Sequence, residues 1–243
     1  MPVSAGDKLG PYELLSPIGK GGMGEVWKAH DPRLNRDVAI KVSAVQFSER
    51  FEREAKAIAA LNHPNICQIY DIGANYLVME FIDGTPLHGP LPQNQALRYA
   101  LQICDALDAA HKKSITHREL KPANILVAAS GMKLLDFGLA KMETTSSSVA
   151  SDTTALTLAL TEVGTVLGTA AYMSPEQAKG EPADARSDIF SFGVVLYEML
   201  SGRQAFSRNS AIETMAAIVR DEPAPLDAPS NLCAIVTLSL IHI

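Results

Sequence analysis

The feature that most constrains the fold is a change in hydrophobic period along the chain. Residues 37–42 (DVAIKV) alternate between apolar side chains on one face and mixed ones on the other, which is the pattern of a strand. Residues 93–112 repeat instead at helical spacing, and residues 188–201 are a nearly all-apolar helix that ends at Gly202. Strands followed by helices predict an α+β protein with a small β-rich part and a larger α-rich part.

Two hairpins are expected in the first third of the chain. Residues 66–72 and 76–82 are short apolar runs joined by a turn-like Gly-Ala-Asn. The other hairpin has the glycine-rich segment 19–24 (GKGGMG) at its tip. Dinucleotide-binding folds use similar segments, but there the glycines open a helix, whereas here the extended EVWKA follows. A glycine tip lets backbone amides approach phosphates, and a merely flexible turn is the alternative.

One helix, over residues 47–62, is expected between the two hairpins. Its apolar side chains form a single stripe, and Glu54 is the only charged member of that stripe. A carboxylate on a buried face needs a cation, and Lys41 on the preceding strand is the nearest candidate. In the alternative interpretation Glu54 lies at a solvated edge of the stripe and Lys41 is a surface lysine.

A further group of motifs lies in the helical part of the chain. Residues 117–124 (HRELKPAN) are followed, in order, by residues 136–138 (DFG), residues 174–176 (SPE) and Asp188. Together with the glycine-rich hairpin, this ordered set resembles the protein kinase family, and specifically the bacterial serine/threonine protein kinases of eukaryotic type. The resemblance covers about residues 11–225.

The resemblance implies a two-lobed protein-kinase fold, with an N-lobe over residues 11–82 that contains one helix and a C-lobe over residues 83–230. It implies ATP and Mg²⁺ as cofactors, since phosphoryl transfer depends on positioning and on electrostatic stabilisation. The catalytic residues that it implies are Lys41, Glu54, Glu119, Lys121, Asn124 and Asp136, of which Asn124 and Asp136 would hold Mg²⁺. The nucleotide-binding residues that it implies are Ile18, Gly19, Lys20, Gly21, Gly22, Met23, Gly24, Val26, Ala39, Lys41, Met79, Glu80, Ile82 and Leu126.

The resemblance also implies how these residues act. Lys41, held by Glu54, would bind the α- and β-phosphates of ATP, and Lys121 would contact the γ-phosphate. Met79 would be the gatekeeper, and residues 80–82 would form the hinge. Asp188 would anchor the catalytic loop by accepting hydrogen bonds from its backbone. The residues expected to sandwich the adenine are Ile18, Val26, Ala39 and Leu126.

Residues 139–173 would form the activation segment, which is rich in hydroxyl side chains. Most of these serines and threonines fit a plain polar loop. Thr161 and Thr165 are the candidates for regulatory phosphorylation, because a phosphate there could pair with Arg118. Thr169 resembles the threonine that contacts the catalytic loop, and Arg186 is a possible second cation.

Glu119 occupies the position at which the family has a catalytic aspartate. It keeps the charge and the acceptor oxygens but adds one methylene, about 1.5 Å of reach. A displacement of about 1 Å can cost roughly 10²-fold in rate, and a catalytic base contributes about 10²–10⁴-fold. We therefore expect a serine/threonine kinase with a weakened base. The alternatives are a nucleotide-binding pseudokinase that acts as a scaffold, and a non-functional truncated fragment.

Composition narrows the partners. A net charge of −6 without a basic block argues against nucleic acid. No apolar run reaches 18 residues, and there is no apolar leader, so no membrane segment is expected. Three scattered cysteines suit a reducing compartment, and we expect a cytoplasmic protein. The partners implied by the resemblance are proteins that bear Ser or Thr, including a second copy phosphorylated in trans. The histidine spacing suggests no zinc site, and the chain has no GxSxG motif.

The end of the chain departs from the family. Residues 231–243 are an atypical apolar tail, and no arginine follows Arg220 to pair with Glu176. The tail could be a core strand or helix, or the start of a membrane segment. The interpretation that we favour at this stage is a truncated or altered reading frame, which would leave the C-lobe incomplete.

Overall fold

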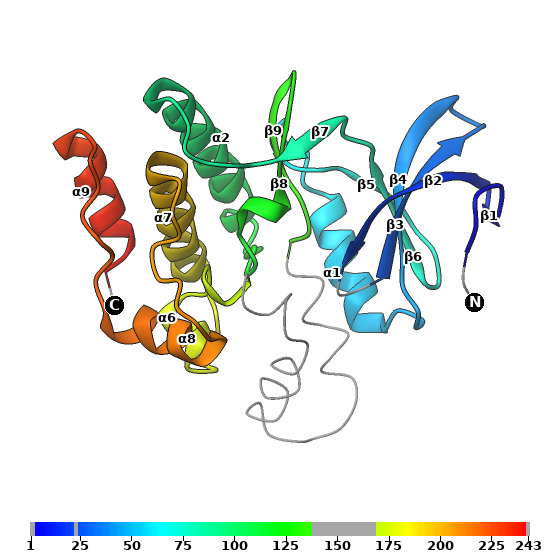
Figure 1. The fold of residues 1–243 in the computed structure, drawn as a ribbon. Coiled ribbons are helices and arrows are strands. Elements are labelled where there is room, and N and C mark those ends of the chain that lie inside the picture. Colours follow the sequence, from blue (N-terminus) through cyan, green and yellow to red (C-terminus); the bar gives the residue numbers. More distant parts are fainter. Residues whose placement is uncertain (1–2, 22–23, 138–168, 242–243) are drawn as a thin grey trace.

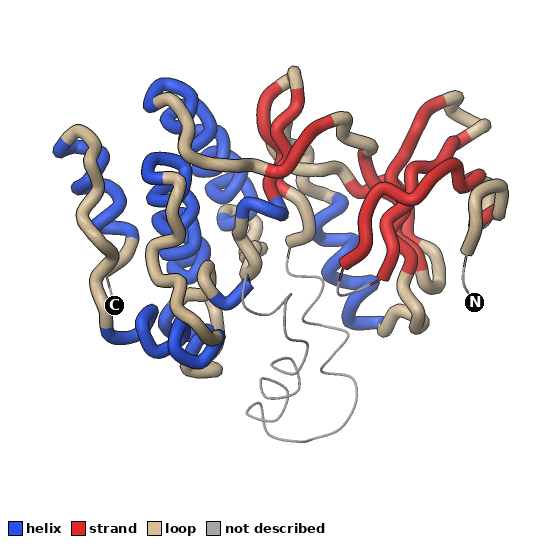
Figure 2. The backbone as a smooth tube through the Cα atoms, in the orientation of Figure 1, coloured by secondary structure: helices blue, strands red, loops and turns tan. Residues whose placement is uncertain are grey.

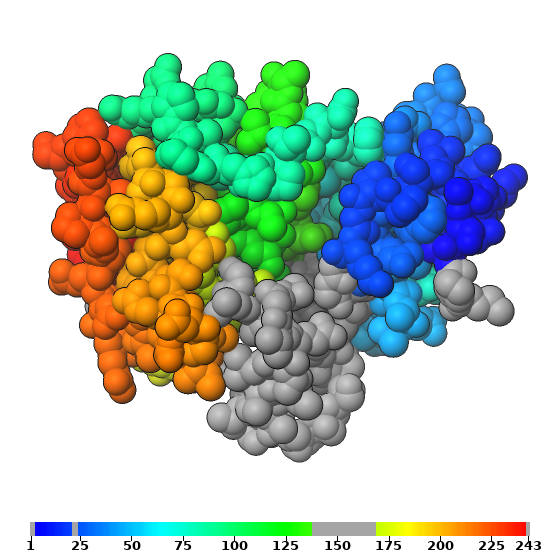
Figure 3. All heavy atoms as spheres, viewed as in Figure 1, coloured from blue at the N-terminus to red at the C-terminus, as the bar shows by residue number. Residues whose placement is uncertain are grey.

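The protein, analysed as a computed structural model, is described over residues 3–21, 24–137 and 169–241. It has two lobes, as predicted, and the strands gather in the N-terminal lobe while the long helices form the other (Figures 1 and 2). In the space-filling view the two ends of the chain lie at opposite ends of the molecule (Figure 3).

A six-stranded antiparallel sheet with the order β1-β2-β3-β4-β6-β5 forms the N-lobe. Its strands are β1 (Lys8–Leu9), β2 (Tyr12–Gly21), β3 (Gly24–Asp31), β4 (Arg36–Val42), β5 (Ile69–Ile72) and β6 (Tyr76–Glu80). The alternation of residues 37–42 is confirmed. Val38 and Ile40 pack into one apolar cluster on the sheet, and Ala39 packs into the cluster on the other face. The glycine-rich hairpin is also confirmed, with Gly21 opposite Gly24.

Helix α1 (Glu49–Ala59) is the single helix among the described residues of the N-lobe and buries Phe51, Ala55 and Ile58. Ser48 caps its N-terminus, where the Ser48 hydroxyl accepts a hydrogen bond from the Phe51 amide at 3.2 Å. The expected helix over residues 47–62 is therefore confirmed but is shorter at both ends. Ser48 is its N-cap, and after Ala60 the Leu61 amide donates to the Ile58 carbonyl, three residues back, in place of the regular bond to the fourth residue back.

The C-lobe is built on two long helices that pack side by side (Figure 1). Its elements are the strands β7 (Gly84–Pro86), β8 (Ile125–Ala128) and β9 (Gly131–Leu134), a 3₁₀ helix η1 (Pro122–Asn124), and the helices α2 (Gln93–His111), α6 (Pro175–Ala178), α7 (Ala185–Ser201), α8 (Ala211–Arg220) and α9 (Ser230–Ser239). Both long helices were predicted from the hydrophobic period.

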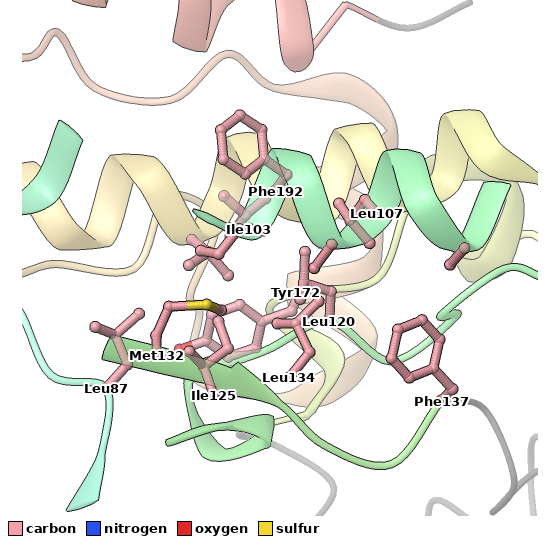
Figure 4. Packing of buried hydrophobic residues seen from close by; sticks show 14 of the residues in the cluster. Leu87, Ile103, Leu107, Leu120, Ile125, Met132, Leu134, Phe137, Tyr172 and Phe192 are labelled. Atoms are coloured by element: carbon pink, nitrogen blue, oxygen red, sulfur yellow. The ribbon is translucent and has the colours of Figure 1, made fainter. Parts of the chain in front are cut away.

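Between the long helices and the small β7-β8-β9 sheet lies the main apolar core. Ile103 and Leu107 project from α2 toward Met132 and Leu134 of β9 (Figure 4). Phe192 of α7 belongs to the same apolar cluster, but its ring points to the opposite side of the helices in this view. Because β9 leads directly to residues 135–137, this core fixes the start of the DFG motif.

The apolar tail forms helix α9, which packs against α7. Leu232, Val236 and Leu240 are buried, while Ile235 and Leu238 are exposed. The close approach uses Gly193 of α7, where an added Cβ would lie 2.7 Å from the Ser239 Cβ. For residues 231–241 the helix alternative therefore describes the tail.

Candidate active site

Asp188, in the first turn of α7, anchors the loop that contains residues 117–124. Its side chain is 1% exposed, and its two carboxylate oxygens accept hydrogen bonds from the His117 and Arg118 amides, each at 2.8 Å. The predicted anchoring role is thus confirmed. Arg118 has φ +65°, a left-handed conformation that is unfavourable for a non-glycine residue. The two bonds to Asp188 hold the backbone in that conformation.

A third donor reaches the same carboxylate from helix α2. His111 Nε2 lies 2.7 Å from Asp188 Oδ2 at the end of that helix. A second tie comes from α6, where the Gln177 side-chain amide donates to the Arg118 carbonyl at 2.8 Å. The loop is therefore bonded directly to α7 and α6, and α2 contacts it indirectly through the Asp188 carboxylate.

Glu119 lies on this anchored loop with its carboxylate uncommitted. The Asn124 side-chain amide donates to the Glu119 carbonyl at 2.8 Å, which fixes the backbone on both sides of Lys121. Within the described residues the Glu119 carboxylate accepts no hydrogen bond and forms no ion pair. It is a free acceptor on a rigid backbone.

Lys121 lines the same small pocket as Glu119. Its ammonium group donates to the Thr169 hydroxyl at 3.2 Å, so the predicted contact of Thr169 with the catalytic loop is confirmed. A small pocket of about 20 Å³ opens here, with room for about one water molecule. It is lined by Arg118, Glu119, Leu120, Lys121, Thr169, Tyr172, Met173 and Gln177.

His117 is fully buried and packs against Phe137 of the DFG motif, with ring centroids 4.6 Å apart. Its Nδ1 accepts a hydrogen bond from the Glu119 amide at 3.3 Å, while Nε2 has no partner among the described residues. Burial lowers the pKa of His117 below its usual range, because the charged ring would lose its hydration. The neutral ring acts as part of the core and links the loop to the segment that carries Asp136.

The predicted ion pair between Lys41 and Glu54 is not formed, and that prediction is wrong for this structure. Lys41 Nζ lies instead 2.9 Å from Asp136 Oδ2. The Glu54 side chain is 39% exposed, with its oxygens 3.5 Å from Arg50 Nε and 3.9 Å from Arg118 Nη1. The physical reason is that Glu54 lies at the hydrated edge of the α1 stripe, where it needs no buried cation.

The residues expected to bind the nucleotide lie on neighbouring strands. Ala39 is opposite Met79 in the β4–β6 register, and Val26 is opposite Lys41 in the β3–β4 register. Leu126 lies on β8 in the C-lobe, opposite Lys133 in the β8–β9 register. The remaining expected contacts within the described residues are Gly19, Lys20, Gly21 and Gly24 on the hairpin, Ile18, which is exposed, Glu80 at the end of β6, and Ile82 after it. The predicted residues Gly22, Met23, Thr161 and Thr165 lie outside the described residues.

Asn124 and Asp136 offer the oxygen ligands that Mg²⁺ prefers. Because the Asn124 Nδ2 donates to the Glu119 carbonyl, its Oδ1 is left available for a cation. Asp136 contributes a carboxylate, one oxygen of which faces Lys41. Two protein ligands suit Mg²⁺, which keeps waters and substrate phosphates in its coordination shell. Within residues 3–21, 24–137 and 169–241, no group of three His, Cys, Asp or Glu side chains could hold a metal ion.

Comparison of the sequence with family models identifies the family. The family model "Protein kinase domain" matches residues 12–233, nearly the whole chain. This chain belongs to the protein kinase family. The predicted resemblance, and the two-lobed kinase fold that it implied, are confirmed.

Several relatives of this kinase domain are bacterial serine/threonine kinases. The chain is 42% identical over 235 residues to the serine/threonine-protein kinase PknB of Mycobacterium leprae (strain TN), covering 88% of this chain and 36% of the relative. It is 41% identical over 251 residues to PknB of Mycolicibacterium smegmatis, covering 94% of this chain and 38% of the relative. A probable serine/threonine-protein kinase of Streptomyces coelicolor is 40% identical over 242 residues, with 91% and 34% covered. The chain thus spans about a third of the length of these relatives.

Some residues of the kinase site carried no signal in the sequence. His111 and Gln177 hold the catalytic loop but belong to no motif used above, and their partners lie 77 and 59 residues away. Glu176, for which the sequence offered no arginine after Arg220, accepts a hydrogen bond from the Ser187 hydroxyl. Arg186, the expected second cation, is paired with Asp184 at 2.8 Å.

In the part of the chain that the structure describes, no helix is long and apolar enough to cross a bilayer.

Proposed function

We propose that this chain is a serine/threonine protein kinase that transfers the γ-phosphoryl group of ATP to Ser or Thr hydroxyls of proteins, including a second copy of itself in trans. The observation that carries the proposal is the uncommitted Glu119 carboxylate beside Lys121 on a loop that Asp188 and Asn124 hold. The printed names of the relatives support the same reaction class.

In this proposal Glu119 accepts a hydrogen bond from the substrate hydroxyl, orients its oxygen toward the γ-phosphorus and takes up the proton as the new P–O bond forms. The bond between the γ-phosphorus and the β,γ-bridging oxygen breaks in the same step, and ADP leaves with that oxygen. Lys121 neutralises charge on the transferred group. Asn124 and Asp136 hold Mg²⁺, which when bound offsets the charge of the phosphates. Because Glu119 is one methylene longer than aspartate, its carboxylate does not take the position that an aspartate carboxylate would take. A displacement of about 1 Å is enough to slow transfer strongly, so we expect a slow enzyme.

The active arrangement requires an exchange of ion pairs. Lys41 is paired with Asp136, and both side chains are needed on the nucleotide side: Lys41 for the phosphates and Asp136 for Mg²⁺. Glu54 is the carboxylate that would take over Lys41, and it is near Arg118 at 3.9 Å. We propose that a phosphate on Thr161 or Thr165 pairs with Arg118 and so releases Glu54 toward Lys41.

The test is autophosphorylation with labelled ATP and Mg²⁺. It compares the unchanged protein with Glu119→Asp and with Lys41→Met as the blank. We expect a weak signal in the unchanged protein, a gain of about 10–10²-fold in Glu119→Asp, and no signal in Lys41→Met.

The same assay separates the second candidate function. Glu119 itself favours a pseudokinase that binds ATP without transfer, since the family position has aspartate. A signal only in Glu119→Asp, together with ATP binding by the unchanged protein, would establish the pseudokinase. Absence of both transfer and ATP binding in every variant would refute both functions.

A further inference from the structure

Lys133 and Glu80 form an ion pair that joins the two lobes away from the catalytic loop. The Lys133 ammonium group lies 2.6 Å from Glu80 Oε1 and 2.7 Å from Oε2, so both carboxylate oxygens are engaged. The side chains are only 17% and 24% exposed. Most other ion pairs of the described residues include a side chain that is at least one-third exposed, and the Lys41–Asp136 pair is accounted for by the catalytic site.

Glu80 ends strand β6, where the chain leaves the N-lobe. It is held on its other side by Gln68, whose carbonyl accepts from the Glu80 amide at 2.8 Å and whose amide donates to the Glu80 carboxylate at 3.3 Å. The Gln68 side chain in turn donates to the Ala59 carbonyl at the end of α1, at 2.8 Å. The Glu80 carboxylate is thus the point at which Lys133 meets the end of β6 and, through Gln68, the last turn of α1.

Lys133 lies on β9, which the backbone already ties to residues 65–67. The Leu134 amide donates to the Asn65 carbonyl at 2.8 Å, and the Cys67 amide donates to the Leu134 carbonyl at 2.9 Å. Lys133 is paired in register with Leu126 of β8 and precedes Asp136 by three residues. Its backbone is therefore part of the same rigid unit as a proposed adenine contact and a proposed metal ligand.

We propose that Lys133 is a positioning residue of the nucleotide site. Through Glu80 it fixes the segment that follows β6, the proposed hinge, relative to Leu126 and Asp136. The inference rests on the proposed function, because it concerns how tightly that site holds ATP. A partly buried carboxylate that loses its cation must rehydrate, and it does so by moving toward solvent. When Glu80 moves, the hinge moves with it and the adenine contacts no longer coincide with the phosphate contacts.

The prediction that follows is a selective loss of nucleotide affinity. Lys133→Met keeps the length of the side chain and removes its charge. We expect it to raise the dissociation constants of ATP and ADP, and the KM for ATP, about tenfold. We expect kcat at saturating ATP to change by less than about threefold, because Lys133 touches neither the catalytic loop nor the transferred group.

The matched control is Lys112→Met. Lys112 forms an equally short pair with Asp108, at 2.6 Å, but the two side chains are 73% and 62% exposed. Its loss should leave nucleotide binding unchanged, since exposed pairs contribute little. The double variant Lys133→Glu with Glu80→Lys restores the pair with reversed charges and should recover part of the affinity that Lys133→Met loses, since the reversed pair still lacks an acceptor for the Gln68 amide.

ADP and ATP binding are measured by calorimetry, with kinetics of phosphoryl transfer and thermal melts on the same samples. Unchanged dissociation constants in Lys133→Met overturn the inference and leave the proposed function standing. A lowered melting temperature with unchanged binding at 10 °C also overturns it, since the pair would then be structural only. Absence of nucleotide binding by the unchanged protein refutes the proposed function, and the inference with it.

Discussion

Asp188→Asn is the perturbation whose effect can be worked out most fully. The aspartate serves three donors at 2.7–2.8 Å: the amides of His117 and Arg118 and the His111 ring. An asparagine has one acceptor oxygen, and its NH₂ group would face a backbone N–H. One buried amide therefore loses its acceptor.

The expected cost follows from these contacts. A buried donor without a partner costs about 1–3 kcal/mol, and hydrogen bonds to a charged group are worth more than neutral ones. The strained φ of Arg118 adds to the tendency of the loop to relax. We expect a loss of about 2–4 kcal/mol in the free energy of unfolding, or a fall in melting temperature of about 4–16 °C. Because the loop carries Glu119, we expect transfer to fall by about 10²-fold or more.

The assay is urea unfolding followed by circular dichroism, with Asp184→Asn as the control. Asp184 caps the same helix and accepts from the Arg186 amide at 2.8 Å, but its side chain is 54% exposed. Asparagine is as good an N-cap as aspartate, so the control should lose less than about 1 kcal/mol. Equal stability of the two variants would refute the reasoning that Asp188 holds the catalytic loop.

The remaining predictions concern single groups. Burial raises the pKa of the Cys67 thiol, so iodoacetamide at pH 8 should label the exposed Cys104 in native protein and Cys67 only after unfolding; rapid native labelling of Cys67 would contradict its burial. Burial lowers the pKa of His117, so the unfolded state binds this proton more strongly than the folded state does. The stability that comes from neutral His117 is complete above about pH 6.5 and is lost as the pH falls below that value. His117→Phe should therefore flatten the dependence of the unfolding free energy on pH between 7 and 5. Gly202 ends α7 with φ +70°, and an added Cβ there would lie 2.6 Å from a proline ring carbon, whereas Gly180 has φ +77° and open space around it. In urea unfolding, Gly202→Ala should therefore destabilise the protein by more than the roughly 1 kcal/mol expected for Gly180→Ala. Equal losses in the two variants would contradict the contact.

The elements with a clear hydrophobic period could be predicted from sequence. Strand β4 alternates because its two faces contact two apolar clusters, and α7 is apolar all round because other elements cover it. The tail that forms α9 was harder to predict, since most of its residues are apolar and the pattern did not distinguish the buried Leu232 from the exposed Leu238. Its helix is evident only from the packing against α7.

The candidate site was predictable where a motif names a residue and not where packing decides its partner. The order of the motifs indicated Asp188 as the anchor of the loop, and the structure agrees. The stripe on α1 indicated a face for Glu54 but could not show that the edge of that face is hydrated. The prediction that Glu54 pairs with Lys41 was therefore wrong. His111 lies 77 residues from Asp188, and nothing local connects them.

The last turn of helix α1 is hydrogen-bonded to side chains from segments that lie outside the helix. The carbonyls of Ala59 and Ala60 accept from Gln68 and Lys113 at 2.8 and 2.7 Å, whereas the serine cap at the other end is local. Such a helix can rotate about its C-terminal end. Glu54 lies six residues from Ala60, about 9 Å along the axis, so a rotation of about 20° moves its backbone by roughly 3 Å. That displacement is comparable to the length of one ion pair, and a small tilt of α1 is enough to exchange the partner of Glu54 without unfolding any part of the lobe.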